Sequence, residues 1–158
     1  MTTEQKIYSL PQLLEQCAVW KKEGQKTVFT NGCFDILHLG HIDYLEKAKF
    51  LGTKLIVGVN ADSSVKKLKG ETRPINNEYA RSRMLAALAF VDAVVLFGED
   101  TPLQLIEHIM PTVLVKGNDY SIENIVGADI VLANGGEVKT IALVNGYSTT
   151  NLIAKIAK

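Results

Sequence analysis

The segment TNGCFDILHLGHIDYLEKAK, residues 30–49, holds the side chains best suited to chemistry. A β-type run leads into a loop with Gly32 and Gly40, and a helical pattern begins near His41. His38 and His41 stand three residues apart at the start of that helix, where free backbone N–H groups and the helix dipole favour an anion. Two imidazoles placed there can donate hydrogen bonds to charge that develops on a phosphoryl group in transit. The pattern predicts a phosphate site in which His38 and His41 are catalytic.

Other uses of these side chains compete with that prediction. A single histidine is more often a surface residue or a helix cap than a catalytic group. Zinc usually takes three or four protein ligands, but His108 is the only other histidine and the two cysteines, Cys17 and Cys33, are widely spaced. The strand–loop–helix context therefore favours the phosphate site. Cys33 has no separate base, so we expect it to be a small neighbour of the site and not a nucleophile.

Two further segments place polar groups where a ligand could meet them. Lys116, Gly117 and Asp119 close a buried strand pattern, at the edge where parallel sheets bind ligands. A lysine elsewhere in such a pattern would simply extend over the surface. Residues 148–150 place hydroxyl and N–H groups at the start of the last helical pattern, which is either an ordinary N-cap or a second anion site.

The connection between the patterns at 54–60 and 77–90 is unusually long. Its sixteen residues, 61–76, carry Lys66, Lys67, Lys69 and Arg73 against Asp62 and Glu71. Connections of this length are functional or disordered. The segment is therefore either a basic loop that closes over a triphosphate or a solvated, mobile loop with a short helix in it. Arg81 stands in the first turns of the next helical pattern, where the helix dipole does not favour a cation, and its simplest interpretation is a solvent-facing residue.

Short β-rich runs alternate with longer amphipathic runs along the chain. The β-rich runs cover 27–30, 54–60, 93–97, 112–116 and 137–143, and the helical patterns cover 9–24, 41–51, 77–90, 102–110, a stretch after Ser121 and the end of the chain from 149 or 150. The runs lack strict polar–apolar alternation, as strands covered on both faces do. The order predicts an α/β fold with one doubly wound, parallel, five-stranded sheet and helices on both faces. We expect residues 1–158 to form one domain, with an N-terminal helix at about 9–24 and a catalytic core at about 26–158.

Length and composition narrow the class of protein. The chain has 158 residues, of which 47% are apolar and 22% charged, as is usual for a folded globular domain. Lys and Arg together number 17 and so do Asp and Glu, and this balance argues against a nucleic-acid or acidic-membrane partner. The first residues lack a signal-peptide pattern, no apolar run approaches the roughly 18 residues that span a bilayer, and the two cysteines suggest reduced thiols. We therefore expect a cytoplasmic protein.

Several of these motifs resemble those of a known family. His38-Leu39-Gly40-His41 after Gly32-Cys33-Phe34-Asp35 resembles the signature of the cytidylyltransferase-like nucleotidyltransferases. Within that superfamily, further stretches resemble the D-glycero-β-D-manno-heptose 1-phosphate adenylyltransferases of the ADP-heptose pathway. These stretches are Lys67–Gly70 with Arg73-Pro74, Arg81 with the helical pattern up to Asp92, Val115–Tyr120, Ala133–Val138 and Ser148–Asn151. The resemblance covers about residues 10–158. Many members carry this unit behind a ribokinase-like sugar kinase, and this chain is similar to the stand-alone form.

The resemblance implies a Rossmann-like sheet and a set of site residues. The nucleotide would be bound by Phe34, Gly40, His41, Asn60, Arg81, Lys116, Gly117, Ser148, Thr149 and Thr150. The substrate would be bound by Asp35, Lys67, Lys69 and Asp119. Mg²⁺ would be carried by the ATP phosphates, with no metal ligand from the protein. Similar enzymes are usually homodimers, and a separate sugar kinase would act upstream.

The sequence therefore predicts an adenylyltransferase, a nucleotidyltransferase that moves AMP from ATP to a sugar 1-phosphate. The most specific expectation for the acceptor is D-glycero-β-D-manno-heptose 1-phosphate, and the products are an ADP-sugar and pyrophosphate. One alternative is a glycerol-phosphate-type cytidylyltransferase, because charges and spacing do not fix the base. Another is a non-catalytic nucleotide-binding module. A dinucleotide-dependent oxidoreductase is excluded, because no GxGxxG follows the first β-rich run.

Overall fold

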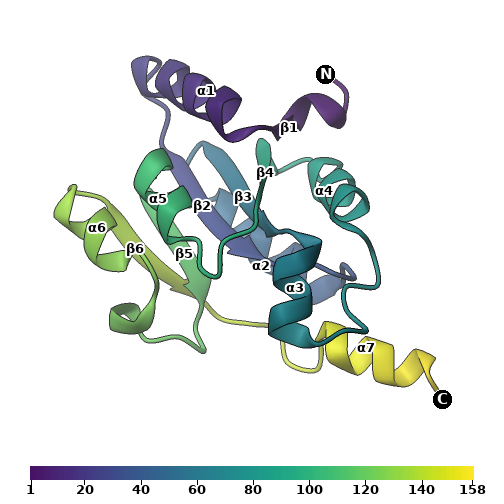
Figure 1. The fold of residues 1–158 in the computed structure, drawn as a ribbon. Helices are drawn as coiled ribbons and strands as arrows, with labels where there is room; N and C mark the ends of the chain where they lie inside the picture. The colour runs from purple at the N-terminus through teal and green to yellow at the C-terminus, as the bar shows by residue number, and fades with distance from the viewer.

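A parallel sheet of six strands runs through the protein, whose computed structural model describes residues 1–158 (Figure 1). The strands are β1 (Ile7–Tyr8), β2 (Thr27–Gly32), β3 (Lys54–Asn60), β4 (Ala93–Phe97), β5 (Val113–Gly117) and β6 (Glu137–Ile141). The predicted parallel α/β sheet is confirmed, but the predicted number of five strands is wrong. The extra strand, β1, has two residues and pairs with β4 at the edge of the sheet, and it is too short to show a β-type pattern.

The helices follow the predicted alternation with strands. They are α1 (Leu10–Lys22), α2 (Leu39–Lys49), α3 (Asp62–Lys69), α4 (Glu78–Ala86), α5 (Leu103–Ile109), α6 (Ala128–Ala133) and α7 (Thr149–Ile156), with 3₁₀ turns at Glu4–Lys6 and Ile122–Asn124. None of the helices combines the length and the apolar character that crossing a bilayer requires. The helix expected over 77–90 ends early, at Ala86, and the pattern after Ser121 divides into a 3₁₀ turn and the short α6.

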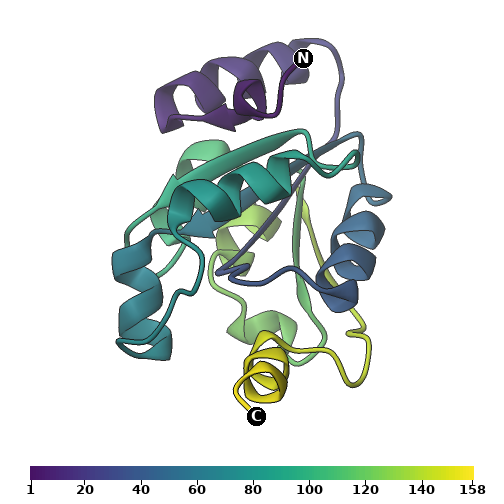
Figure 2. The ribbon, with the colours of Figure 1, turned by 90° about the vertical axis from the view of Figure 1, so that its right-hand side faces the viewer.

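Helices cover both faces of the sheet, so the core forms two apolar layers (Figures 1 and 2). On one face Leu13 of α1 and Ile106 of α5 pack with Phe29 of β2. On the other face Leu45 of α2 and Leu85 of α4 pack against the opposite side of the strands. All five side chains are fully buried, and each contributes roughly 1.5–3 kcal/mol through the hydrophobic effect.

The long connection at 61–76 is more regular than a mobile loop. Its first half forms the eight-residue helix α3, which ends at Gly70. Gly70 has φ 102°, a backbone conformation that glycine adopts without steric cost. Asn77 then caps α4, because its side-chain oxygen accepts a hydrogen bond from the Ala80 N–H at 2.9 Å.

The strand order places a ligand-binding crevice beside β2. The sheet runs β1-β4-β3-β2-β5-β6, so the chain moves from β2 through β3 to β4 on one side and then crosses to β5 on the other side of β2. In open parallel sheets, ligands bind at such a switch point, outside the carboxyl ends of the strands. Here those ends carry Gly32 on β2 and Lys116 with Gly117 on β5.

Candidate active site

A cavity of about 580 Å³ opens at the carboxyl ends of the strands. It collects residues from β2, the loop after β2, α2, β3, the 69–73 segment, the end of β5 and the start of α7. The predicted site residues that line it are Phe34, Asp35, His38, Gly40, His41, Asn60, Lys69, Lys116, Gly117, Asp119, Ser148, Thr149 and Thr150. Lys67 and Arg81 are the two predicted residues that do not line it.

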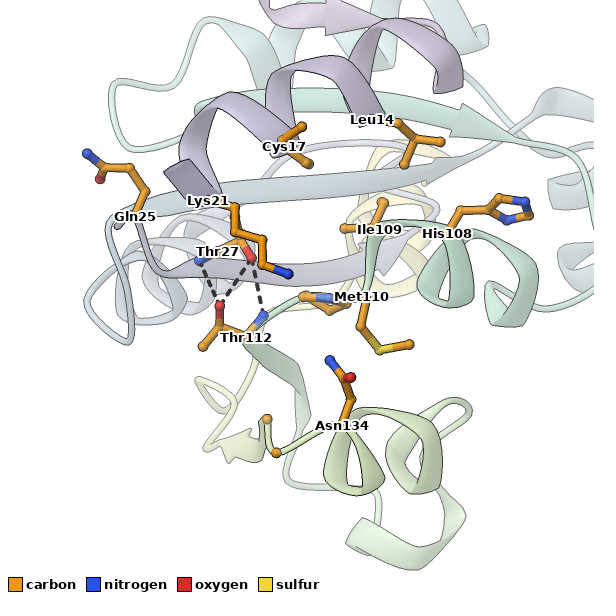
Figure 3. A pocket seen from close by; sticks show the side chains of 14 residues that line it. Leu14, Cys17, Lys21, Gln25, Thr27, His108, Ile109, Met110, Thr112 and Asn134 are labelled. Atoms are coloured by element: carbon orange, nitrogen blue, oxygen red, sulfur yellow. Dashed lines mark hydrogen bonds between the residues drawn. The ribbon is translucent and has the colours of Figure 1, made fainter. Parts of the chain in front are cut away.

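A second cavity, of about 540 Å³, lies at the opposite, amino-terminal end of the strands, between α1, the end of α5 and the 134–136 turn (Figure 3). Hydrogen bonds between Thr27 and Thr112 fix one of its walls. Cys17 lines the cavity from α1, and burial raises the pKa of its thiol to about 11, so the thiol stays protonated near neutral pH. None of the predicted site residues lines this cavity, and we place the candidate active site at the other end of the sheet.

The two histidines of the motif form a stacked pair in the site. Their ring centroids lie 3.8 Å apart with 24° between the planes, and Phe34 packs against His41 at 5.3 Å between centroids. The Nδ1 atoms of both histidines are buried and have no hydrogen-bond partner in the chain. Burial lowers the pKa of His38, and burial together with the neighbouring His38 lowers the pKa of His41 to about 4. Near neutral pH the free protein therefore presents two uncharged imidazoles at the N-terminus of α2.

Glycines let the backbone approach closely at two points of the cavity. A Cβ on Gly40 would lie 2.9 Å from Cε1 of His38. A Cβ on Gly117 would lie 2.7 Å from Oδ1 of Asp119. Phe34, between β2 and α2, takes the uncommon φ of 49°, which is a strained backbone conformation for a bulky side chain. The backbone that borders the cavity thus includes positions that tolerate few substitutions.

Lys116 contributes a partly buried cation. Its Nζ donates a hydrogen bond to the Asn31 carbonyl at 3.3 Å and lies 5.8 Å from the centroid of the Tyr120 ring. Burial lowers the pKa of Lys116 to about 8, although nearby Asp119 acts in the opposite direction. The amine therefore stays mostly protonated near neutral pH and loses its charge as pH rises through about 8.

The start of α7 is tied to the loop after β2. Ser148 caps the helix by accepting a hydrogen bond from the Asn151 N–H at 3.0 Å, and the Thr149 hydroxyl donates to the Ile36 carbonyl at 3.3 Å. Both helix N-termini, of α2 and α7, thus border the same cavity. The arrangement offers free N–H groups to an anion from two directions.

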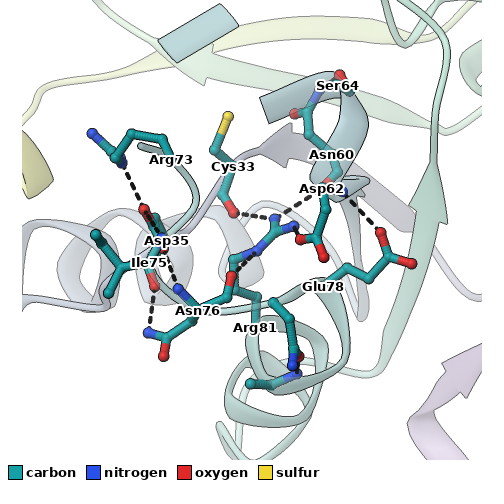
Figure 4. A network of polar contacts seen from close by, with 12 residues as sticks. Cys33, Asp35, Asn60, Asp62, Ser64, Arg73, Ile75, Asn76, Glu78 and Arg81 are labelled. Carbon is teal, nitrogen blue, oxygen red and sulfur yellow. Dashed lines mark hydrogen bonds and ion pairs between the residues drawn. The ribbon is translucent and has the colours of Figure 1, made fainter. Parts of the chain in front are cut away.

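Asp35 lines the cavity, but its carboxylate is already occupied by the chain. It accepts hydrogen bonds from Arg73 Nε at 2.6 Å, from the Ile75 N–H and from the Asn76 N–H (Figure 4). Burial would raise the pKa of Asp35, but these hydrogen bonds outweigh it and hold the pKa below its usual value. The resemblance implied that Asp35 binds the substrate, but in the structure both of its oxygens anchor the 73–76 segment.

Arg81 was expected to contact the nucleotide, but it lies buried behind the cavity. Its side chain is fully buried and donates to the carbonyls of Cys33, Asn60 and Asn76 and to the Asp62 carboxylate, at 2.7–2.9 Å (Figure 4). It neither faces solvent nor reaches the cavity, so this expectation is corrected to a structural role. Arg81 joins four chain segments around the site.

Three other lysines near the motif, Lys47, Lys49 and Lys67, do not line the cavity. The Lys67 side chain is 72% exposed, pairs with Asp100 at 3.3 Å and does not line the cavity, so its contact with the substrate stays a prediction. Lys47 pairs with Asp43, and Lys49 pairs with Asp92 at the other end of its helix. Lys69 is the lysine of α3 that lines the cavity.

Several lining residues were not predicted from the sequence. Asn31 is the last but one residue of β2, and its side-chain oxygen is buried without a partner. Tyr44 lies one helical turn after His41, and its hydroxyl pairs with Thr30 at 2.8 Å. Tyr120 directly follows Asp119. Their closeness in sequence to predicted residues is the signal that could have found them.

Fold and cavity together define a class of protein, an α/β nucleotide-binding domain with a histidine pair at the switch point of its sheet. A comparison with protein families supports that class, because residues 29–155 match the family described as Cytidylyltransferase-like. The chain belongs to the cytidylyltransferase-like family, and the resemblance noted from the sequence is confirmed.

The chain is similar to several known proteins. Bifunctional protein HldE from Marinomonas sp. (strain MWYL1) is 58% identical over 149 residues, which are 94% of this chain and 31% of that protein. The chain thus spans about a third of the length of the curated relatives it matches. The crystal structure of the lipopolysaccharide core biosynthesis protein from Thermoplasma volcanium GSS1 is 31% identical with a TM-score of 0.61, over 79% of this chain and 100% of that one. Pantoate-beta-alanine ligase from Francisella tularensis shares the fold alone, at 15% identity and a TM-score of 0.62, over 94% of this chain and 76% of that one.

Proposed function

We propose that the chain is an adenylyltransferase that moves AMP from ATP to D-glycero-β-D-manno-heptose 1-phosphate and releases pyrophosphate. The observation that carries the proposal is the pair of uncharged imidazoles, His38 and His41, at a helix N-terminus inside a cavity that also holds Lys69, Arg73 and Lys116. The HldE relatives and the relative named for lipopolysaccharide core biosynthesis support the choice of a heptose phosphate.

The reaction is an in-line displacement at phosphorus. A phosphate oxygen of the sugar 1-phosphate forms a bond to the α-phosphorus of ATP, and the bond to the bridging oxygen breaks as pyrophosphate leaves with the electron pair. No covalent enzyme intermediate is needed, so catalysis consists of positioning and charge stabilisation. His38 and His41 donate hydrogen bonds to the α-phosphoryl oxygens, where negative charge is redistributed in the transition state.

Cationic side chains hold the remaining charge of the substrates. The cavity is lined by three cationic side chains and two carboxylates: Lys69, Arg73 and Lys116 against Asp35, which pairs with Arg73, and Asp119. This excess of positive charge favours polyphosphates over neutral ligands. The N-terminus of α7, at 148–150, supplies additional N–H and hydroxyl donors.

Mg²⁺ enters this proposal as the ion of the ATP complex. No group of three His, Cys, Asp or Glu side chains in the structure could hold a metal ion. Mg²⁺ commonly binds through phosphate oxygens, water and one or two carboxylates, and Asp119 is the carboxylate of the cavity that could join them. The ion would neutralise phosphate charge during the displacement.

We further propose a cytoplasmic homodimer in which residues 1–158 form one catalytic domain. A sugar kinase would supply the sugar 1-phosphate, because the acceptor must carry a phosphate before the transfer. Sedimentation of the purified chain tests the dimer independently of its activity.

A substrate screen tests the proposed function. ATP and CTP are each paired with sugar 1-phosphates and with glycerol phosphate, and pyrophosphate release is measured. The proposal expects release with ATP and the heptose 1-phosphate. Release with CTP and glycerol phosphate would replace the proposal by the cytidylyltransferase alternative. ATP binding without release for any acceptor would point to a non-catalytic nucleotide-binding module.

A further inference from the structure

Two of the three guanidinium nitrogens of Arg73 have no hydrogen-bond partner in the structure. Its Nε donates to Asp35 Oδ2 at 2.6 Å, while its two Nη groups make no hydrogen bond or ion pair within the chain. The side chain is only 12% exposed, and it lines the cavity that holds His38 and His41. An arginine fixed at one nitrogen and open at the other two presents a planar pair of donors to an anion.

The partner that fixes Arg73 is itself held firmly. Asp35 is fully buried, and its carboxylate also accepts hydrogen bonds from the Ile75 N–H at 2.8 Å and the Asn76 N–H at 2.9 Å. These contacts keep the carboxylate ionised and in one orientation, so the guanidinium has a fixed support.

Asn76 holds the same segment in place through three of its polar groups. Its side-chain Nδ2 donates to the Asp35 carbonyl at 2.8 Å, its N–H donates to the Asp35 carboxylate, and its carbonyl accepts from Arg81 Nε at 2.9 Å (Figure 4). Asn76 is thereby held between the loop after β2 and the buried Arg81. The segment that carries Arg73 cannot shift without breaking these contacts.

We propose that Asp35 and Asn76 form a brace that holds Arg73 as a preset phosphate-binding residue of the cavity, with Asn76 as a positioning residue. The inference rests on the proposed nucleotidyl transfer, in which the ligand is the triphosphate or the sugar phosphate. Preset donors bind an anion without first ordering a flexible side chain, which is the advantage of a fixed arginine over a mobile lysine.

Binding and turnover of five proteins test this brace: wild type, Arg73→Gln, Arg73→Lys, Asn76→Ala and the double variant Arg73→Gln/Asn76→Ala. The dissociation constant for inorganic pyrophosphate is measured by calorimetry, and KM and kcat are measured for both substrates. Arg73→Gln should weaken pyrophosphate binding and raise the KM of one substrate roughly ten- to hundredfold, as expected for loss of hydrogen bonds to a charged group. Arg73→Lys should not restore full binding, because an ammonium beside Asp35 lacks the planar pair of donors that the guanidinium presents to the ligand.

The Asn76 variants separate positioning from simple stabilisation. Asn76→Ala should weaken binding severalfold, and the double variant should bind no more weakly than Arg73→Gln alone, because Asn76 acts through Arg73. Lys22→Gln, a charge change on the exposed end of α1, and Asn124→Ala, which removes a local side-chain bond to Ser121 at 2.8 Å, are the matched controls. Both controls should bind like wild type.

Three results would overturn the brace: unchanged binding in folded Arg73→Gln, full rescue by Arg73→Lys, or multiplicative losses in the double variant. If circular dichroism shows that Arg73→Gln does not fold, the pyrophosphate affinity of Arg73→Lys alone tests the brace: weakened binding supports it, and binding like wild type overturns it. A wild-type protein that releases no pyrophosphate with any acceptor contradicts the proposed function, whereas the calorimetric titration still decides whether Arg73 binds phosphate.

Discussion

The imidazoles of His38 and His41 are stacked with 3.8 Å between ring centroids. Two positive charges at that separation would repel each other strongly, and burial disfavours charge on either ring. The pKa of His41 accordingly falls to about 4, and that of His38 falls as well. The pair therefore offers hydrogen-bond donors without positive charge in the free protein, and the fixed charge of the cavity comes from lysine and arginine.

Lys116 should make substrate capture depend on pH. Its pKa is lowered from the ordinary lysine value to about 8, so the free protein loses this positive charge as pH rises through about 8. We expect kcat/KM for ATP, which reports groups of the free enzyme, to fall above that pH. In Lys116→Arg the side chain stays charged, and the fall should move to more alkaline pH.

The control for this pH profile is Lys26→Arg. Lys26 is a half-exposed lysine that pairs with Glu137 at 2.9 Å at the amino-terminal edge of the sheet. Its profile should match that of the wild type. An identical alkaline fall in Lys116→Arg would show that another group controls capture.

Gly40→Ala should damage catalysis more than stability. The added Cβ would lie 2.9 Å from Cε1 and 3.0 Å from Nδ1 of His38, so the imidazole must move. Alanine favours the helix, and a displacement of about 1 Å at a catalytic group can cost about a hundredfold in rate. We expect kcat to fall at least roughly tenfold while the melting temperature stays within a few degrees.

Gly98→Ala is the matched control for Gly40→Ala. A Cβ on Gly98 would meet only the Cβ of Ala61, at 4.0 Å. It should leave kcat unchanged. Equal kcat values for the two variants would mean that the position of His38 does not limit the rate.

Arg81→Lys should destabilise the fold. A lysine cannot satisfy the three carbonyls and the carboxylate that the buried guanidinium joins, and loss of such a buried charge network costs about 3 kcal/mol. The free energy of unfolding, measured in urea, should fall by about that amount.

Arg83→Lys serves as the comparison for Arg81→Lys. Arg83 is 38% exposed and pairs with Glu4, and an exposed ion pair is worth at most about 1 kcal/mol. If Arg81→Lys were as stable as Arg83→Lys but raised the KM for ATP, Arg81 would have to contact the nucleotide after all.

The sequence predicted the main parts of the fold because these follow local rules. Five of the strands are runs of apolar residues bounded by turns, and the pattern of Leu and Ala residues marks α2 and α4. The strand β1 was not predicted, because two residues are too few to show a β-type hydrophobic pattern. Its strand conformation depends on pairing with β4. The helix α3 was expected only as part of a loop, because only two of its eight residues, Val65 and Leu68, are apolar.

Side-chain placement was the harder part of the site to predict. The motif spacing located His38, His41 and Gly40, because a strand end and a helix start fix them within a few residues. Arg81 could not be placed in this way, since its burial depends on carbonyls from segments up to 48 residues away in the chain. Charge composition likewise gives the number of cationic side chains but not which of them face the cavity. Lys69 lines the cavity, whereas Lys67 points to solvent.

The rate of pyrophosphate release with saturating ATP and heptose 1-phosphate, in His38→Ala and His41→Ala, tests the central claim most directly. His108→Ala is the control, because the third histidine is exposed and lies at the other cavity. The proposal predicts that kcat falls roughly a hundred- to a thousandfold in both motif variants, as for loss of a transition-state hydrogen-bond donor, while ATP binding by calorimetry changes little and His108→Ala retains wild-type kcat. Near-normal kcat in either motif variant, with unchanged ATP binding, would contradict it.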